Sequence, residues 1–354
     1  MSNVIALNVL PRRQRLAERT DALIDGFARH RRIQDDVFWL KENAELLNIL
    51  ECTGTPVSQE ALTPHLAFYG SLTERLQFFP QYYRFLLSIG LDLEDLGVAG
   101  AQMERLCEWV AKQGLPEAEL SDLQRAEARR LLARRGVHTA AADPGLDDRL
   151  HAFINRPATF ALPNKKAAYE LTHIVFYLSE YGRKDPGLDP RALVSLEYAG
   201  ILALLDQNMD LLAEICVAMR QAGQAANPVW EAAVRQTVNG FDVRQDGDAP
   251  LSDDYHEYLV ANWACATAGQ DQMARAVPEG RAVFQRPVLA AGALRPMSSA
   301  LLSFADARSA DWEQMQAGLY DMLDPDAGDT LRTSEASSPH FAAFFEQFAR
   351  AVPA

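Results

Sequence analysis

The chain has 354 residues, 48% of them hydrophobic, which is enough to bury a large core in one domain or two. Its formal net charge of −14 disfavours phosphate backbones and anionic lipid surfaces, so we expect no nucleic-acid and no membrane partner. No apolar run approaches the roughly 18 residues of a membrane span, and four scattered cysteines without a CxxC pair predict a soluble, cytoplasmic protein with reduced thiols.

The chain is predicted to be helical almost throughout, because Ala, Leu, Glu, Arg and Gln dominate it and alternating strand patterns are scarce. The expected helices span residues 14–31, 34–51, 72–90, 100–113, 121–135, 146–154, 164–181, 190–205, 208–222, 228–239, 252–268, 297–319 and 337–350. Short turns between them predict antiparallel helical hairpins. The expected fold is therefore all-α, built either as a helical bundle or as an α/α toroid.

Three polar segments interrupt the expected helices. Residues 136–145 form a candidate linker, residues 241–250 are rich in Asp and Gly, and residues 323–336 are expected to form an acidic loop. We place a boundary in the first segment, between an N-terminal helical subdomain (1–140) and a C-terminal helical subdomain (141–354) that carries the candidate site. One continuous domain is the alternative, since the length permits both.

One face of the expected helix 164–181 mixes ionisable and aromatic side chains. At about 100° per residue, this face collects Tyr169, Glu170, His173, Phe176, Tyr177, Glu180 and Tyr181. Aromatic side chains are costly to leave in water, so we expect the face to line a pocket or an interface. The alternative is an exposed amphipathic face whose tyrosines keep their hydroxyl groups in water.

The expected helix 252–268 supplies a second histidine on an apolar stripe. Asp253 precedes His256 by three residues, and Glu170 precedes His173 by the same spacing. Residues three apart share a helical face, so each carboxylate and its histidine can converge on one point. The alternatives are that His256 is a core side chain with both nitrogens hydrogen-bonded and that Asp253 stabilises the N-terminus of its helix.

Two further carboxylates fall on otherwise apolar helical faces. Glu42 shares its face with residues such as Trp39, and Glu197 shares its face with residues such as Ile201. A buried carboxylate needs an ion pair, a hydrogen bond or a metal, or else its pKa rises until it is protonated. We expect both side chains to be largely buried. A structural ion pair, with Arg84 as a candidate partner, is the alternative to a functional role.

Together these positions match the ligand inventory of a di-metal site in a four-helix bundle, which takes two glutamates and two Glu-x-x-His pairs. The candidate metal ligands are Glu42, Glu170, His173, Glu197, Asp253 and His256. At these six positions the pattern resembles the non-haem di-iron carboxylate proteins, which implies a bound Fe, Mn or Zn and oxidoreductase chemistry. The chain departs from the family pattern at Asp253, whose side chain is one methylene shorter than that of the usual glutamate.

A metal-free interpretation uses some of the same residues on a small organic substrate. His173 would act as general base or acid, Glu170 or Glu180 would orient it, and Tyr177 would donate to a developing oxyanion. Such a site would suit a lyase, a hydrolase or a cyclase. The sequence contains no G-x-S-x-G, P-loop, G-x-G-x-x-G or H-E-x-x-H motif.

A third interpretation is that the protein is a helical scaffold or binding protein without catalytic activity. The aromatic run 78–85 and the aromatic face of helix 164–181 would then bind a protein partner or a second copy of the chain. Core packing is the alternative that we favour for the run 78–85, because large aromatic side chains are mostly buried.

Two strings extend the comparison beyond single residues. The segments ELTHIVFYLSEYG, at 170–182, and DDYHEYLVANWA, at 253–264, are similar to an uncharacterised all-helical bacterial protein family. This resemblance implies a helical fold and no particular activity.

Overall fold

The computed structural model describes residues 14–34, 36–139, 143–248 and 252–350. Its α-helices are α1 (Leu16–Asp25), α2 (Val37–Cys52), α3 (Gln59–Leu62), α4 (Leu66–Phe78), α5 (Tyr83–Asp95), α6 (Gln102–Lys112), α7 (Asp122–Ala133), α8 (Leu146–Ile154), α9 (Pro157–Phe160), α10 (Lys165–Leu178), α11 (Pro190–Leu205), α12 (Met209–Gln221), α13 (Pro228–Gly240), α14 (Tyr255–Thr267), α15 (Leu294–Ser303), α16 (Trp312–Met322), α17 (Pro325–Ala336) and α18 (Phe341–Ala349). The predicted all-α class is confirmed, and none of the described helices is long and apolar enough to cross a membrane.

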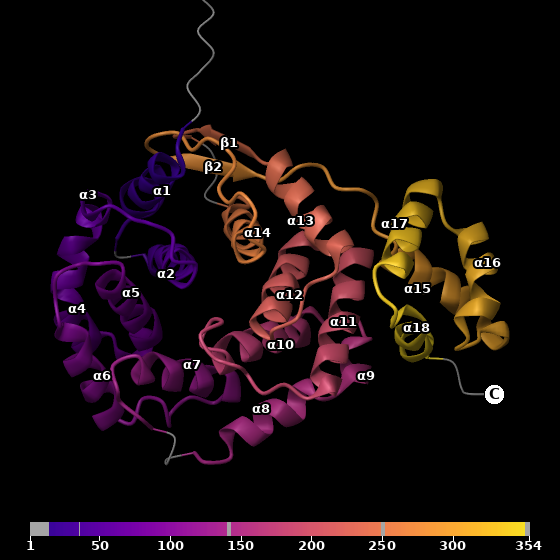
Figure 1. Ribbon diagram of the computed structural model, residues 1–354, viewed down its shortest axis with the longest axis horizontal. Helices are drawn as coiled ribbons and strands as arrows, with labels where there is room; N and C mark the ends of the chain where they lie inside the picture. The colour runs from indigo at the N-terminus through magenta and orange to yellow at the C-terminus, as the bar shows by residue number, and fades with distance from the viewer. Residues whose placement is uncertain (1–13, 35, 140–142, 249–251, 351–354) are drawn as a thin grey trace, which may run out of the picture.

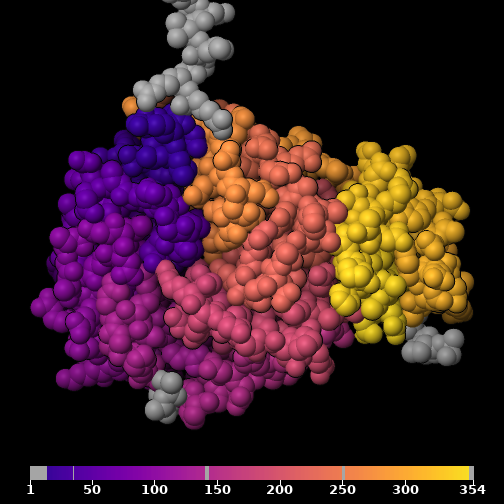
Figure 2. Space-filling view, in the orientation of Figure 1, coloured from indigo at the N-terminus to yellow at the C-terminus, as the bar shows by residue number. Residues whose placement is uncertain are grey.

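The helices before residue 270 form a double ring, the α/α toroid of the two predicted architectures. Within the described part of the chain, α2, α5, α7, α10, α12 and α14 pack one against the next, and α14 returns to α2, so the inner ring is closed. Helices α4, α6, α8, α11 and α13 lie outside this ring and pack against inner helices (Figure 1). Closure of the ring places α2 beside α14, which lies more than 200 residues further along the chain. Figure 2 shows this contact, where the orange segment around α14 meets the indigo N-terminal helices.

Helices α15 to α18 form a separate cluster on the outside of the ring. They pack against α9 and α11, and they are drawn in yellow in Figure 1. Trp312 holds the cluster together through edge-to-face contacts with Phe341 and Phe345, at ring-centroid distances of 5.0 and 4.9 Å. These helices therefore add mass to one side of the toroid and contribute no residue to the lining of its central cavity.

The predictions of single helices over 72–90 and 297–319 are wrong. Pro80 separates α4 from α5, because a proline disfavours helical backbone at the residue before it, and Phe79 adopts φ −121° and ψ 58°. Ala305, with a left-handed φ of 47°, follows α15 closely, and Asp311 begins α16 by accepting a hydrogen bond from the Glu313 amide.

The predicted acidic loop 323–336 is also wrong, because this segment forms α17. Asp324 caps the helix by accepting a hydrogen bond from the Ala327 amide, and Pro325 occupies the first helical position. The Asp-Pro pair was a helix-start signal within a segment whose Asp and Gly content suggested a loop.

A two-stranded antiparallel sheet escaped prediction. β1 (Asp242–Gln245) pairs with β2 (Ala282–Gln285), with Asp242 opposite Gln285. Each strand has four residues, too few for alternation to be recognised. Part of the weak segment 241–250 thus forms β1, while residues 249 and 250 lie outside the described residues.

The proposed boundary near residue 140 lies between α7 and α8, and residues 140–142 of the candidate linker lie outside the described residues. Packing crosses this boundary at two places in the inner ring, between α7 and α10 and between α14 and α2. The division into subdomains 1–140 and 141–354 stays a prediction.

Candidate functional site

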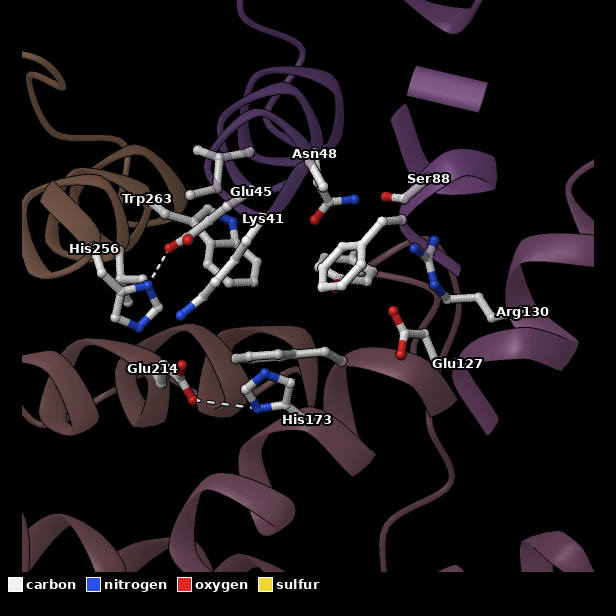
Figure 3. Close-up of a pocket in the computed structure, with 16 residues that line it drawn as sticks. Lys41, Glu45, Asn48, Ser88, Glu127, Arg130, His173, Glu214, His256 and Trp263 are labelled. Carbon is white, nitrogen blue, oxygen red and sulfur yellow. Dashed lines mark hydrogen bonds and ion pairs between the residues drawn. The ribbon is translucent and has the colours of Figure 1, made fainter. Parts of the chain in front are cut away.

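A cavity of about 200 Å³ lies at the centre of the inner ring, and all six inner helices contribute to its wall (Figure 3). Its lining residues are Lys41, Ala44, Glu45, Asn48, Ile49, Phe85, Ser88, Glu127, Arg130, His173, Phe176, Tyr181, Glu214, His256, Val260 and Trp263. Four of the lining residues are aromatic, and both histidines singled out in the sequence also line the cavity.

His173 on α10 presents one ring nitrogen to the cavity. Its Nδ1 lies 2.8 Å from the backbone oxygen of Tyr169, and a carbonyl oxygen only accepts, so Nδ1 donates. In the neutral ring the lone pair must then be on Nε2. Figure 3 shows this second nitrogen pointing into the cavity, away from Glu214. The ring therefore has the tautomer and the direction required of a general base.

Glu214 on α12 lies behind His173. One of its carboxylate oxygens is 3.5 Å from Nδ1 of His173, and the hydroxyl of Thr172 donates to the same oxygen. Burial raises the pKa of Glu214, and the positive charge of a protonated His173 acts in the opposite direction. Glu214 is thus placed to stabilise the histidine when it takes up a proton. Sequence reasoning missed Glu214, although a carboxylate on the apolar helix 209–221 is the same signal that identified Glu42.

His256 on α14 has both ring nitrogens occupied. Nδ1 donates to Glu45 on α2, and Nε2 lies 3.2 Å from a carboxylate oxygen of Asp210 on α12 in an ion pair. Burial lowers its pKa, but the charges and hydrogen bonds of Glu45 and Asp210 outweigh burial and raise the pKa of His256 to about 11. His256 is therefore an imidazolium at neutral pH and serves as a fixed positive charge rather than as a base.

Asp210 connects the two histidines. It accepts a hydrogen bond from the hydroxyl of Tyr169 at 2.6 Å, and the backbone of the same Tyr169 holds His173. Burial raises the pKa of Asp210, but the hydrogen bond and charge of His256 outweigh burial and lower it. The two histidines thus belong to one network of hydrogen bonds and ion pairs, although each was identified in the sequence from a different motif.

Replacing His256 with glutamine should reduce stability at neutral pH and remove part of its pH dependence. A pKa raised from 6.5 to about 11 on folding gives stabilisation that is complete below pH 6.5 and is lost as pH rises towards 11. The side chain is 38% exposed, so solvent screening limits the effect to about 1 kcal/mol. We expect the melting temperature of His256→Gln to lie below that of the wild type at pH 7, and this difference in melting temperature to be smaller at pH 10. A difference that is constant with pH would contradict the charged state.

Glu42 and Asp253, two of the predicted metal ligands, meet at an arginine instead. Arg31 donates from Nε to Glu42 at 2.9 Å and from both terminal nitrogens to Asp253, at 2.8 and 2.7 Å. Arg32 also donates to Glu42. The prediction that Glu42 is buried with a cationic partner is confirmed, since the residue is 0% exposed. These carboxylates need no metal because the guanidinium groups already satisfy them.

The other predicted residues lie outside the lining of the cavity. Glu170 and Glu197 are half-buried and do not line the cavity, and Glu197 has one buried oxygen without a partner in the described residues. Glu180 pairs with Lys184 at 2.7 Å. Tyr177 packs its ring against that of His173, with centroids 6.0 Å apart.

Among the described residues, no group of three or more His, Cys, Asp or Glu side chains has the spacing to hold a metal ion. The six predicted ligands are divided because the guanidinium of Arg31 lies between Glu42 and Asp253 and because Glu170 and Glu197 lie outside the cavity wall. Metal binding itself stays a prediction.

A family model described as a domain of unknown function, DUF6902, covers residues 1–351 of the chain. No curated protein and no solved structure matches the chain.

Proposed function

The chain belongs to the DUF6902 family, a family without an assigned function, and we propose from its cavity that it is an acid–base enzyme acting on a small organic substrate, with His173 as the general base. The observation that carries this proposal is the hydrogen bond from Nδ1 of His173 to the Tyr169 carbonyl, which leaves the lone pair of Nε2 facing the cavity. For a histidine that only packs against its neighbours, both ring nitrogens are expected to be hydrogen-bonded, so an unpaired ring nitrogen facing a cavity favours a functional role.

The remaining polar groups support a reaction in which negative charge develops on the substrate. His256 is a fixed cation, and the ammonium group of Lys41 extends into the same space from α2 (Figure 3). Preformed positive groups stabilise an enolate or a tetrahedral oxyanion without reorganising. We therefore infer a lyase or hydrolase type of reaction, begun by proton removal from the substrate or from a water molecule.

In this proposal Tyr177 and Glu180 change from their predicted roles. Tyr177 supports the ring of His173 by edge-to-face packing, whereas oxyanion stabilisation falls to Lys41 and His256. Glu180 is engaged with Lys184, so the orienting carboxylate is Glu214.

Four free cysteines support the cytoplasmic location expected from the sequence.

A turnover screen tests the proposal. Purified protein would be incubated with pools of small organic acids, esters and lactones, and conversion followed by mass spectrometry. We expect at least one pool to be converted by the wild type and not by His173→Gln. Conversion at equal rates by both proteins would remove His173 from the chemistry.

Metal assistance, suggested by the resemblance to di-iron carboxylate proteins, is a separate proposal with its own measurement. Elemental analysis of protein purified without an affinity tag should find Fe, Mn or Zn in near-stoichiometric amounts if a metal is bound, and less in His173→Ala. We expect instead a metal-free protein whose melting temperature does not change with a chelator, because Arg31 occupies Glu42 and Asp253.

A protein-binding function is the second candidate, and exposed aromatic residues favour it. The expectation that run 78–85 packs into the core holds for Tyr83, which is 4% exposed, but Phe78 and Phe79 are 75% and 41% exposed. Phe38 and Ile33, also exposed, add to the apolar surface of the N-terminal half. If this surface is an interface between copies of the chain, Phe78→Ser should lower the molar mass measured by light scattering.

A further inference from the structure

Arg130 on α7 is a buried cation without a hydrogen-bonding partner for its side chain among the described residues. The residue is 6% exposed, and its Nε and Nη1 are shut off from solvent without an acceptor. The guanidinium carbon lies 4.4 Å from the ring centre of Tyr181. An arginine stacked on an aromatic ring keeps the edge of its guanidinium available for a planar anion. A buried guanidinium without an anion is costly to the fold, which favours an anion brought by a ligand.

The carboxylates of the cavity do not fill this role, because other cations already engage them. Glu45 accepts a hydrogen bond from His256, and Glu127 accepts one from Arg84. Glu214, the third carboxylate of the lining, lies 3.5 Å from Nδ1 of His173 and accepts a hydrogen bond from Thr172. In the part of the chain that the structure describes, Lys41 and Arg130 are left as the cavity cations that form no ion pair or hydrogen bond with a carboxylate. The cavity is thus locally suited to an anion although the whole protein is acidic.

A second unsatisfied donor lies on the same side of the cavity. Asn48 on α2 is 7% exposed, and its Nδ2 is buried without an acceptor. Figure 3 shows Asn48 and Arg130 with Ser88 between them, on the side of the cavity opposite His256. A buried amide and a buried guanidinium that both lack acceptors are two exceptions to the rule that buried polar groups are paired. One ligand group with two oxygens would satisfy both.

We propose that this wall of the cavity binds the carboxylate of a small aromatic or apolar carboxylic acid. The carboxylate would lie between Arg130 and Asn48, and the apolar part of the ligand would lie against the rings of Phe176 and Trp263, towards Nε2 of His173. A planar monoanion fits one guanidinium and one amide, whereas a phosphate dianion would need more donors. The inference deepens the proposed function by naming the substrate class, and it rests on that function only for the role of His173.

Benzoate is a suitable probe, because it combines a carboxylate with an aromatic ring. Its binding to the full chain would be measured by calorimetry and by the fluorescence of Trp263, with Trp263→Phe identifying the signal among the five tryptophans. We expect saturable binding of benzoate, and at least about tenfold weaker binding of the neutral benzamide, since hydrogen bonds to a charged group are the stronger ones. Tighter binding of phenylphosphonate than of benzoate would overturn the assignment to carboxylates.

Substitution of Arg130 provides the decisive comparison. Arg130→Gln should weaken benzoate binding at least about tenfold, whereas Arg129→Gln, on the same helix with an exposed partner in Asp147, should bind as the wild type does. Asn48→Asp keeps the shape of the side chain and adds a negative charge, so it should also weaken benzoate binding about tenfold. This variant provides the test if Arg130→Gln does not fold. Benzoate binding that is unchanged in either folded variant would overturn the proposal.

The same probe separates this inference from the proposed chemistry. Binding of benzoate needs no proton transfer, so His173→Gln should bind it within about threefold of the wild type. Arg130-dependent binding without turnover of any carboxylic acid would support the anion site and contradict the acid–base function. Turnover that depends on His173 but not on Arg130 would contradict the anion site alone.

Discussion

His173→Gln is expected to lower kcat/KM for any substrate found in the turnover screen by a factor of about 10² to 10⁴, the usual contribution of a general base. The melting temperature should change by less than about 2 °C, because the side chain is 34% exposed and lies at the edge of a cavity rather than in packed core. Thermal unfolding and steady-state kinetics on the same preparation measure both quantities. The combination of lost activity and retained stability is what distinguishes a site residue from a core residue.

His138→Gln serves as the matched control, because His138 is exposed and does not line the cavity. It should leave both activity and melting temperature unchanged. If His173→Gln instead unfolds at a much lower temperature and keeps its activity per folded molecule, His173 is structural and the proposed function fails.

Arg31→Met is expected to cause the largest loss of stability, about 3 to 5 kcal/mol, which is the usual result of removing one partner from a buried ion pair. The side chain of Arg31 is 2% exposed, and it holds Glu42 and Asp253 together with the backbone oxygen of Ala282. Its removal leaves two carboxylates in a low-dielectric region without their main counter-charge. Urea unfolding monitored by circular dichroism measures the change in the free energy of unfolding.

Two further variants test the cause of that loss. The triple variant Arg31→Met, Glu42→Gln, Asp253→Asn removes the uncompensated charges and should recover part of the stability. Arg332→Met removes an exposed arginine paired with Asp329 and should change stability by less than about 0.5 kcal/mol. If Arg31→Met is no more destabilising than Arg332→Met, the ion pairs of Arg31 with Glu42 and Asp253 do not stabilise the fold.

Residue patterns predicted the helices better than the breaks between them. The helix expected over 164–181 matches α10, and that expected over 190–205 matches α11 at both ends. The wrong predictions occur where a capping residue and the local composition indicate different structures. At Asp324-Pro325 the residue pair favours the start of a helix, but the Asp and Gly residues that follow led to the prediction of a loop. Strands of four residues left no periodic signal, so β1 and β2 were not foreseen.

The candidate site was predicted in part. The faces of α10 and α14 pointed to His173 and His256, because aromatic and ionisable side chains at helical spacing are detectable locally. Their partners were not predicted, since Glu45 and His256 lie 211 residues apart in the chain. The pairing of Asp253 with Arg31 spans 222 residues and likewise has no local signature.

The sequence by itself determined that this protein is helical, that Glu42 is buried and that His173 occupies a face unlike ordinary solvent surface. These properties depend on periodicity and on the cost of exposing or burying one side chain, both of which act over a few helical turns. Only the tertiary structure decided that His256 lies between two carboxylates, which raise its pKa to about 11. Closure of the ring brings α2 and α12 to His256, whereas Nδ1 of His173 lies 2.8 Å from the carbonyl oxygen of Tyr169 within its own helix. The charge of His256 therefore follows from residues that are distant in the sequence.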